Sequence, residues 1–134
     1  MGTVLTIGTF DILHAGHAYL LRSCERLGDR VEVGVNSDRF VQAYKGRTPL
    51  FDQDERLAMI RALGYPAHLN DGPGWELIER IAPDVLAIGD DWLGRDYLGQ
   101  IGTTADAFRA ARMVLAYIPN RILSTTEILE RVRA

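Results

Sequence analysis

Two histidines, His14 and His17, stand three positions apart in the segment GTFDILHAGH, with Gly16 beside the second. In the first turns of a helix, residues three apart lie on one face, so both imidazoles can point at one target. Such a pair can bind a metal ion, transfer protons or hold an anion. One capping histidine and one packed histidine would give the same spacing without a ligand. Gly16 leaves room for phosphate groups, and the N–H groups and dipole of a helix start favour an anion there.

The rest of the chain argues against a metal at this pair. A zinc site needs a third protein ligand, and the remaining candidates are His68, the single Cys24 and scattered carboxylates, without metal-like spacing. A single cysteine also excludes an internal disulfide. We therefore expect no residue of this chain to be a dedicated metal ligand.

A second phosphate-binding helix start is predicted near the C-terminus. In ILSTTEIL, Ser124 and Glu127 have the spacing of a capping box, which by itself needs only a helix. Thr125 and Thr126 add two hydroxyls at the same helix start, where an anion is favoured.

The segment GDDW, residues 89–92, follows an apolar stretch. Adjacent carboxylates there are explained by a solvated turn. A carboxylate and an indole also suit cytosine, which offers an amino group and a flat ring.

Three further charged residues have ordinary structural interpretations. Lys45, in YKGRTP, is a solvated surface lysine on a loop whose Gly46 suggests mobility. Arg56 is a helix-surface partner of Asp52 at spacing four. Asp38 caps the following helix or contacts ligand hydroxyls.

The elements that position these residues alternate along the chain. We expect strands over residues 4–7, 31–35, 66–69, 84–88 and 113–118, and helices over residues 14–27, 75–81, 105–112 and 124–133. A further helix follows its cap Asp52 and places Leu57, Ile60 and Leu63 on one face, while residues 43–51 form a loop. This order predicts a single-domain α/β, Rossmann-like sandwich with a five-stranded, mostly parallel sheet and helices on both faces. Sheets of this kind bind ligands outside the carboxyl ends of their strands. Four segments with candidate site residues directly follow predicted strands: residues 8–17, 36–38, 89–92 and 119–126.

Composition limits the class of protein. The 134 residues suit one domain, with 47% hydrophobic and 25% charged residues, as in ordinary globular proteins. The net charge of −3 does not indicate the excess of basic residues that binds nucleic acid or an anionic membrane. No apolar run reaches the ~20 residues of a membrane span, and no secretory leader is visible, so we expect a cytoplasmic protein.

The quoted segments, together with NSDRF and the ER of the Asp52 helix, resemble the cytidylyltransferase-like nucleotidyltransferases, and most closely the glycerol-3-phosphate cytidylyltransferases. The resemblance implies transfer of CMP from CTP to a small phosphorylated alcohol with release of pyrophosphate. It also implies Mg²⁺ bound mainly through the triphosphate, and a homodimer. The roles it implies are as follows: catalytic, His14, His17, Lys45 and Arg121; nucleotide-binding, Gly8, Thr9, Phe10, Asp11, Gly16, Gly89, Asp91, Trp92, Ser124, Thr125 and Thr126; substrate-binding, Asp38, Arg56 and Trp75.

The chain departs from the family pattern at two places. Residues 119–124 read PNRILS, without the glycine of the family segment, and the turn after Trp75 is acidic and apolar. Two alternatives therefore stay open: an adenylyltransferase that uses ATP, and a nucleotide-binding module without turnover. A dehydrogenase fits less well, because no G-x-G-x-x-G follows the first strand. An acceptor phosphate is already ionised near neutral pH, so the histidines are expected to donate hydrogen bonds to the triphosphate rather than act as a base.

Overall fold

The sheet occupies the centre of the molecule. The computed structural model describes residues 2–119 and 125–133, in which five strands form one sheet. They are β1 (Thr3–Gly8), β2 (Arg30–Asn36), β3 (Ala67–Asn70), β4 (Val85–Gly89) and β5 (Val114–Ile118). Their order is β3-β2-β1-β4-β5, and every neighbouring pair is parallel. The predicted α/β class and five-stranded sheet are confirmed, and the sheet is entirely parallel.

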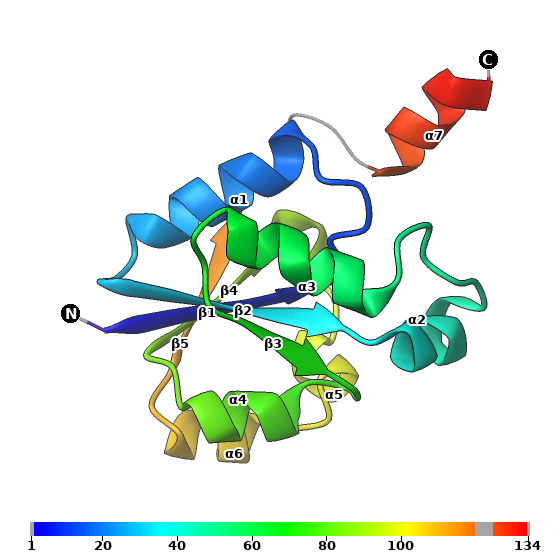
Figure 1. The fold of residues 1–134 in the computed structure, drawn as a ribbon. Helices are drawn as coiled ribbons and strands as arrows, with labels where there is room; N and C mark the ends of the chain where they lie inside the picture. The colour runs from blue at the N-terminus through cyan, green and yellow to red at the C-terminus, as the bar shows by residue number, and fades with distance from the viewer. Residues whose placement is uncertain (1, 120–124, 134) are drawn as a thin grey trace.

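Helices cover both faces of this sheet (Figure 1). The elements are α1 (Ala15–Glu25), α2 (Asp38–Lys45), α3 (Gln53–Ala62), α4 (Trp75–Ile81), the 3₁₀ turn η1 (Asp90–Trp92), α5 (Tyr97–Gln100), α6 (Ala105–Ala110) and α7 (Thr125–Arg133). Figure 1 shows α1 and α3 on one side of the sheet and α4, α5 and α6 on the other.

Alternating residues of the strands fill two cores. Val4 packs with Leu21 of α1 and Ile60 of α3, whereas Leu5, the next residue of β1, packs with Ile78 of α4. Successive side chains of a strand point to opposite faces, so one buried strand serves both layers.

Several expectations about element bounds and burial need correction. The predicted loop over residues 43–51 is wrong in its first three residues, because α2 runs to Lys45. Ser37 caps this helix by accepting a hydrogen bond from the Phe40 N–H (3.0 Å), and Gly46 ends it at a left-handed φ of 70°. The first helix ends at Glu25 rather than at residue 27. Leu63, expected on a buried face, is 56% exposed.

The cap of α3 is confirmed. The Asp52 side chain accepts a hydrogen bond from the Glu55 N–H (2.8 Å), and the Glu55 side chain accepts one from the Asp52 N–H. This capping box fixes the point where the loop after α2 enters α3.

A polar cluster joins β2 to the edge strand β3. The buried carboxylate of Glu32 contacts Arg30 and lies 2.6 Å from Nε2 of His68. Burial opposes ionisation of Glu32, but the hydrogen bonds from Arg30 and His68 outweigh it and hold its pKa below the ordinary value. The cluster therefore contributes to stability when Glu32 is ionised.

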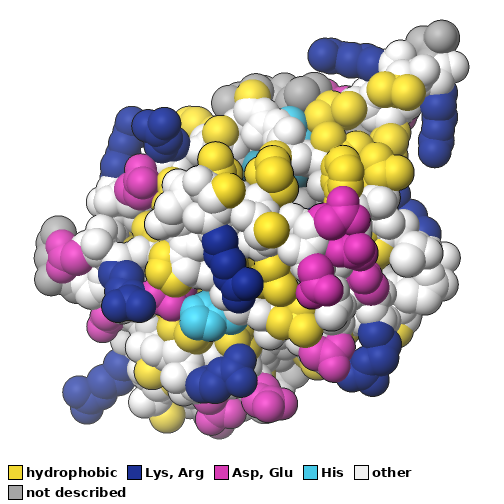
Figure 2. Space-filling model, in the orientation of Figure 1, with side chains coloured by type: hydrophobic (Ala, Val, Ile, Leu, Met, Phe, Trp, Pro, Cys, Tyr) yellow, Lys and Arg dark blue, Asp and Glu magenta, His cyan; other side chains and the backbone are white. Residues whose placement is uncertain are grey.

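Charged side chains of both signs are exposed on the face drawn in Figure 2. None of the helices among the described residues is long and apolar enough to cross a bilayer. Figure 2 shows Lys and Arg side chains spread over this face among Asp and Glu, rather than gathered in one basic patch.

Candidate active site

Three pockets lie in a row at the carboxyl ends of the strands. The first, the anion pocket, has a volume of about 180 Å³. A second, the central pocket, shares Thr9 and Lys45 with it. The third, the Trp75 pocket, has a volume of about 560 Å³ and shares Pro73 and Ile101 with the central pocket. The row occupies the end of the sheet where parallel α/β folds bind ligands.

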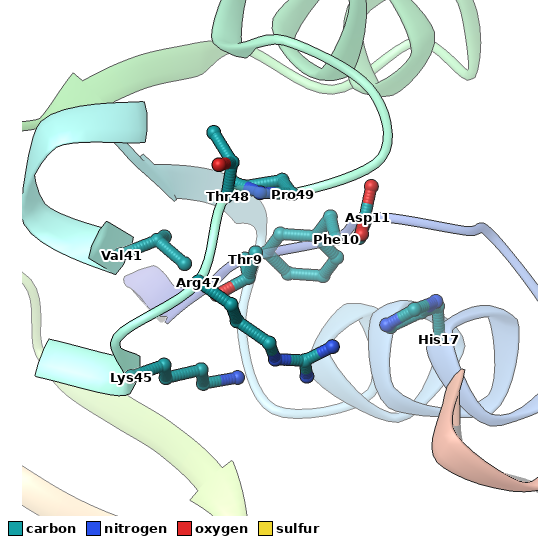
Figure 3. A pocket seen from close by; sticks show the side chains of 9 residues that line it. All are labelled: Thr9, Phe10, Asp11, His17, Val41, Lys45, Arg47, Thr48 and Pro49. Carbon is teal, nitrogen blue, oxygen red and sulfur yellow. The ribbon is translucent and has the colours of Figure 1, made fainter. Parts of the chain in front are cut away.

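Nine residues from three segments line the anion pocket (Figure 3). They come from the loop after β1, from α1, and from the end of α2 with the loop that follows it. The residues are Thr9, Phe10, Asp11, His17, Val41, Lys45, Arg47, Thr48 and Pro49.

The two predicted histidines lie together at the start of α1. His14 is the N-cap residue, and its Nδ1 accepts a hydrogen bond from the Gly16 N–H (3.0 Å). Because Nδ1 accepts, the proton of neutral His14 is assigned to Nε2. The two rings stack with centroids 3.9 Å apart. His14 is thus the capping histidine, and the capping hydrogen bond also orients its ring.

Both imidazoles favour the neutral form. Burial, followed by the neighbouring His14 ring, lowers the pKa of His17 to about 4, against the opposing effects of the Ile12 carbonyl and Asp11. Burial also lowers the pKa of His14, which Glu127 opposes. The buried Nδ1 of His17 completes no hydrogen bond with the described residues, although the Ile12 carbonyl attracts a proton to the ring. Neutral rings can donate a hydrogen bond to phosphate without acting as permanent cations.

Two cationic side chains face His17 across the anion pocket. Figure 3 shows Lys45 and Arg47 extending toward the side of the pocket where the His17 ring lies. Burial, followed by the charge of Arg47, lowers the pKa of Lys45, while Asp11 opposes this shift. An anion bound between Lys45 and Arg47 would offset the repulsion that Lys45 experiences.

Asp11 fixes the loop that carries Arg47. Its two carboxylate oxygens accept hydrogen bonds from the backbone N–H groups of Leu50 (2.8 Å) and Phe51 (2.9 Å). Residues 8–17, the signature segment, are therefore joined directly to the loop between α2 and α3.

Arg56 is a buried structural residue in this conformation. It is 1% exposed, so the helix-surface interpretation is wrong, and it is not among the residues that line the pockets described here. Its guanidinium donates to the backbone carbonyls of Phe51 (2.9 Å), Thr9 (2.8 Å) and Asn36 (2.7 Å). It also donates to the Asp38 carboxylate (2.6 Å). Arg56 thereby fixes the ends of β1 and β2.

Asp38 does not cap α2, because Ser37 does. Its carboxylate accepts hydrogen bonds from Arg56 (2.6 Å) and from the Gln53 N–H (3.2 Å). These bonds account for both of its oxygens.

Sequence reasoning missed a buried amide network whose members line the pockets, Asn36 in the central pocket and Asn70 in the Trp75 pocket. The side-chain amide of Asn70 donates to the side-chain oxygen of Asn36 (2.9 Å) and to the Gly72 carbonyl (2.9 Å). Asn36 in turn donates to the Thr9 hydroxyl (3.4 Å). The available signal was an asparagine at the end of each of two successive strands, in NSD and in LND. Asparagine and aspartate are also common in turns, so the two segments could equally be interpreted as simple turns.

Of the three expected nucleotide-binding residues of the GDDW segment, only Trp92 lines one of these pockets. Trp92 lines the central pocket and packs edge-on against Tyr97, with centroids 5.1 Å apart. Gly8 lines the same pocket. Asp91 is exposed and does not line it, and a Cβ at Gly89 would lie 2.5 Å from Oδ1 of Asp91.

The remaining expected residues fall at the two ends of the row. Trp75, the first residue of α4, lines the third pocket together with Glu76 and Arg80. Thr126 is exposed in the first turn of α7. Arg121 and Ser124 lie outside the described residues, as does the side chain of Thr125. The effect of Glu127 on the pKa of His14 links α7 to the histidine pair.

No group of three His, Cys, Asp or Glu residues capable of holding a metal occurs in residues 2–119 and 125–133. The cationic lining of the anion pocket points instead to a negatively charged ligand.

Comparisons with known proteins agree on one family. The family described as cytidylyltransferase-like matches residues 5–131. The bifunctional protein HldE of Nitratiruptor sp. is 36% identical over 98% of this chain, and that of Campylobacter concisus is 35% identical over 97%. The chain spans 28% and 27% of the lengths of these two relatives.

Two solved structures are similar to this chain in fold. A lipopolysaccharide core biosynthesis protein from Thermoplasma volcanium is similar over 91% of this chain and 98% of its own, with a TM-score of 0.66 and 25% identity. Pantothenate synthetase from Thermus thermophilus is similar over 89% of this chain and 56% of its own, with a TM-score of 0.58. At 14% identity, the second likeness shows the fold alone.

Proposed function

Because the chain belongs to the cytidylyltransferase-like family of nucleotidyltransferases, we propose that it transfers a nucleotidyl group from a nucleoside triphosphate to a small phosphorylated acceptor. An acceptor phosphate oxygen attacks the α-phosphorus, the bond between the α-phosphorus and its bridging oxygen breaks, and pyrophosphate leaves. One observation carries the proposal: His17, Lys45 and Arg47 surround one pocket at the carboxyl end of β1.

The residues of the anion pocket suit this reaction electrostatically. The acceptor phosphate is already ionised, so the limiting tasks are to hold two anions in line and to stabilise the charge that develops. Lys45 and Arg47 offset the repulsion between the anions. Neutral His14 and His17 donate hydrogen bonds to the oxygens whose charge grows during transfer. Mg²⁺ would arrive with the triphosphate and neutralise its oxygens, because the pocket offers cations and few protein ligands for a free metal ion.

The acceptor we propose is a polyol or sugar phosphate. The Trp75 pocket, at about 560 Å³, is larger than glycerol requires. Its lining includes Glu76, Glu79 and Arg80, whose charged groups can hydrogen-bond several hydroxyls. The similar Thermoplasma volcanium protein is named for lipopolysaccharide core biosynthesis, which supports a sugar acceptor.

CTP is the first candidate donor, since GDDW resembles the cytidylyl branch of the family. ATP is the second candidate, and a specific observation favours it. Trp92 offers a ring that stacks on either base, whereas Asp91, expected beside the cytosine amino group, does not line the central pocket.

A pyrophosphate-release screen tests the proposal. Four nucleoside triphosphates are crossed with glycerol 3-phosphate, polyol phosphates and sugar phosphates, with Mg²⁺ present. We expect release that requires one donor and one acceptor class, and its loss in Lys45→Ala but not in Arg22→Ala, an exposed cation of α1. Tight nucleotide binding without release across the panel would support the non-catalytic module instead.

Two further expectations accompany the reaction. We expect a cytoplasmic location, because the reaction consumes nucleoside triphosphate. We also propose a homodimer, on the family resemblance, and sedimentation equilibrium of the purified protein tests it.

A further inference from the structure

Phe10 has an unusual backbone conformation. Three described residues other than glycine have a positive φ: Phe10 (52°), Ala82 (50°) and Arg112 (58°). Ala82 is the C-cap of α4, and Arg112 follows the C-cap of α6, positions where left-handed residues are common. Phe10 lies between β1 and α1, at no helix end. A bulky residue in this region is strained, and such strain is kept where the surroundings require it.

Contacts on both sides of Phe10 hold this conformation. The carbonyl of Thr9 accepts a hydrogen bond from buried Arg56 (2.8 Å), and the carboxylate of Asp11 accepts two from the loop before α3. Gly8 provides the space for the ring, because a Cβ at this position would lie 3.0 Å from Cε2 of Phe10. The backbone and the ring of Phe10 are therefore both fixed.

The ring of Phe10 connects the core to the anion pocket. Phe10 is 3% exposed and belongs to the core cluster of Leu21 and Ile60, yet it also lines the pocket. Its centroid lies 5.3 Å from that of His17, with the two planes tilted by 49°. His17 therefore has Phe10 and the stacked ring of His14 as its two aromatic neighbours.

We propose that Phe10 is a positioning residue for His17: its ring fixes the imidazole against His14 and excludes water from it. The family resemblance assigns Phe10 to nucleotide binding, whereas its burial assigns it to the support of a residue that contacts the nucleotide. The kinetic part of this proposal rests on the proposed function, but the effect on the imidazole does not.

The charged groups around His17 are not the main cause of its lowered pKa. They are Asp11 beside it, His14 stacked on it, Lys45 and Arg47 across the pocket, and Glu127, which acts on His14. Burial is the largest cause of the lowered His17 pKa. An uncharged ring packed against the imidazole contributes through burial alone.

Two variants test the proposal from different directions. Phe10→Leu removes the aromatic contact. Gly8→Ala places a Cβ 3.0 Å from Cε2 of Phe10, so the ring must shift by a few tenths of an ångström while Phe10 and His17 stay chemically unchanged. Ile60→Val is the control, since it removes apolar volume from the same core on α3. The His17 ring protons are titrated by NMR in the ligand-free protein. We expect the His17 pKa to rise by about one unit or more in Phe10→Leu, to rise by a smaller amount in Gly8→Ala, and to stay unchanged in the control.

Kinetics then separate positioning from binding. In Phe10→Leu and Gly8→Ala, kcat should fall by about tenfold or more, while KM for the nucleotide changes by less than about threefold. An unchanged His17 pKa in the folded variants overturns the proposal, and if Phe10→Leu does not fold, Gly8→Ala decides. If the wild-type protein releases no pyrophosphate, the proposed function fails, while the titration still decides the role of Phe10.

Discussion

Replacing Arg56 with methionine removes the buried guanidinium that joins the signature segment to β2 and α3. The change leaves three carbonyls and one carboxylate without their present donor. A net hydrogen bond contributes about 1 kcal/mol, and removal of one partner of a buried ion pair costs about 3–5 kcal/mol, so we expect a loss of about 3–5 kcal/mol. At roughly 3 °C per kcal/mol for a domain of this size, Tm should fall by about 10 °C or more.

Urea unfolding followed by tryptophan fluorescence measures this loss as a change in the free energy of unfolding. Arg61→Met is the matched control, because Arg61 is an exposed residue of the same helix with one hydrogen bond, to the Ala67 carbonyl (2.9 Å). The control should lose about 1 kcal/mol or less. Equal losses in the two variants would refute a structural role for Arg56.

Three further predictions concern charge. Lys45→Ala should lower kcat/KM by about 100-fold, measured by steady-state kinetics, because a donor to the developing charge is lost; an unchanged value would remove Lys45 from the site. The pKa of His17 is lowered from 6.5 to about 4, so the unfolded chain binds a proton over this range that the folded protein excludes. The free energy of unfolding should therefore fall as pH decreases from 6.5 to 4, and His17→Gln, followed by urea unfolding at each pH, should remove that part of the slope; identical slopes would contradict the shift. The pKa of Glu32 is held below 4.5 in the folded protein. The contribution of ionised Glu32 to the free energy of unfolding is therefore complete above about pH 4.5 and is lost as the pH falls below that value. Glu32→Gln should therefore be less stable than the wild type at pH 7, and the difference should shrink in acid; a constant difference would exclude ionisation as the cause.

The alternation of strands and helices made the sheet predictable, because buried strands and amphipathic helices have different periods. The site location followed from the same alternation, since parallel strands bring their carboxyl ends to one edge. The last three residues of α2 were assigned to a loop because Gly46 and Pro49 dominated the interpretation of residues 43–51. Sequence alone did not show that Ser37, rather than Asp38, caps this helix.

The roles of individual side chains were less predictable than their region. At spacing four from Asp52, Arg56 reads as a surface residue, and only the register between α3 and β2 buries its guanidinium. From its position in the segment GTFDILHAGH, Phe10 is expected to bind ligand. Only its left-handed φ brings its ring into contact with the His17 ring. Both depend on contacts between segments far apart in the chain, which local patterns do not contain.

The central claim is that the neutral histidines stabilise the transition state of nucleotidyl transfer. Its most direct test compares the rate of pyrophosphate formation at saturating donor and acceptor in the wild type and in His17→Ala, with the nucleotide Kd measured separately. The account predicts that kcat falls by about 100-fold or more while Kd rises by less than about fivefold. An equal loss in both quantities, or no loss in either, would contradict it.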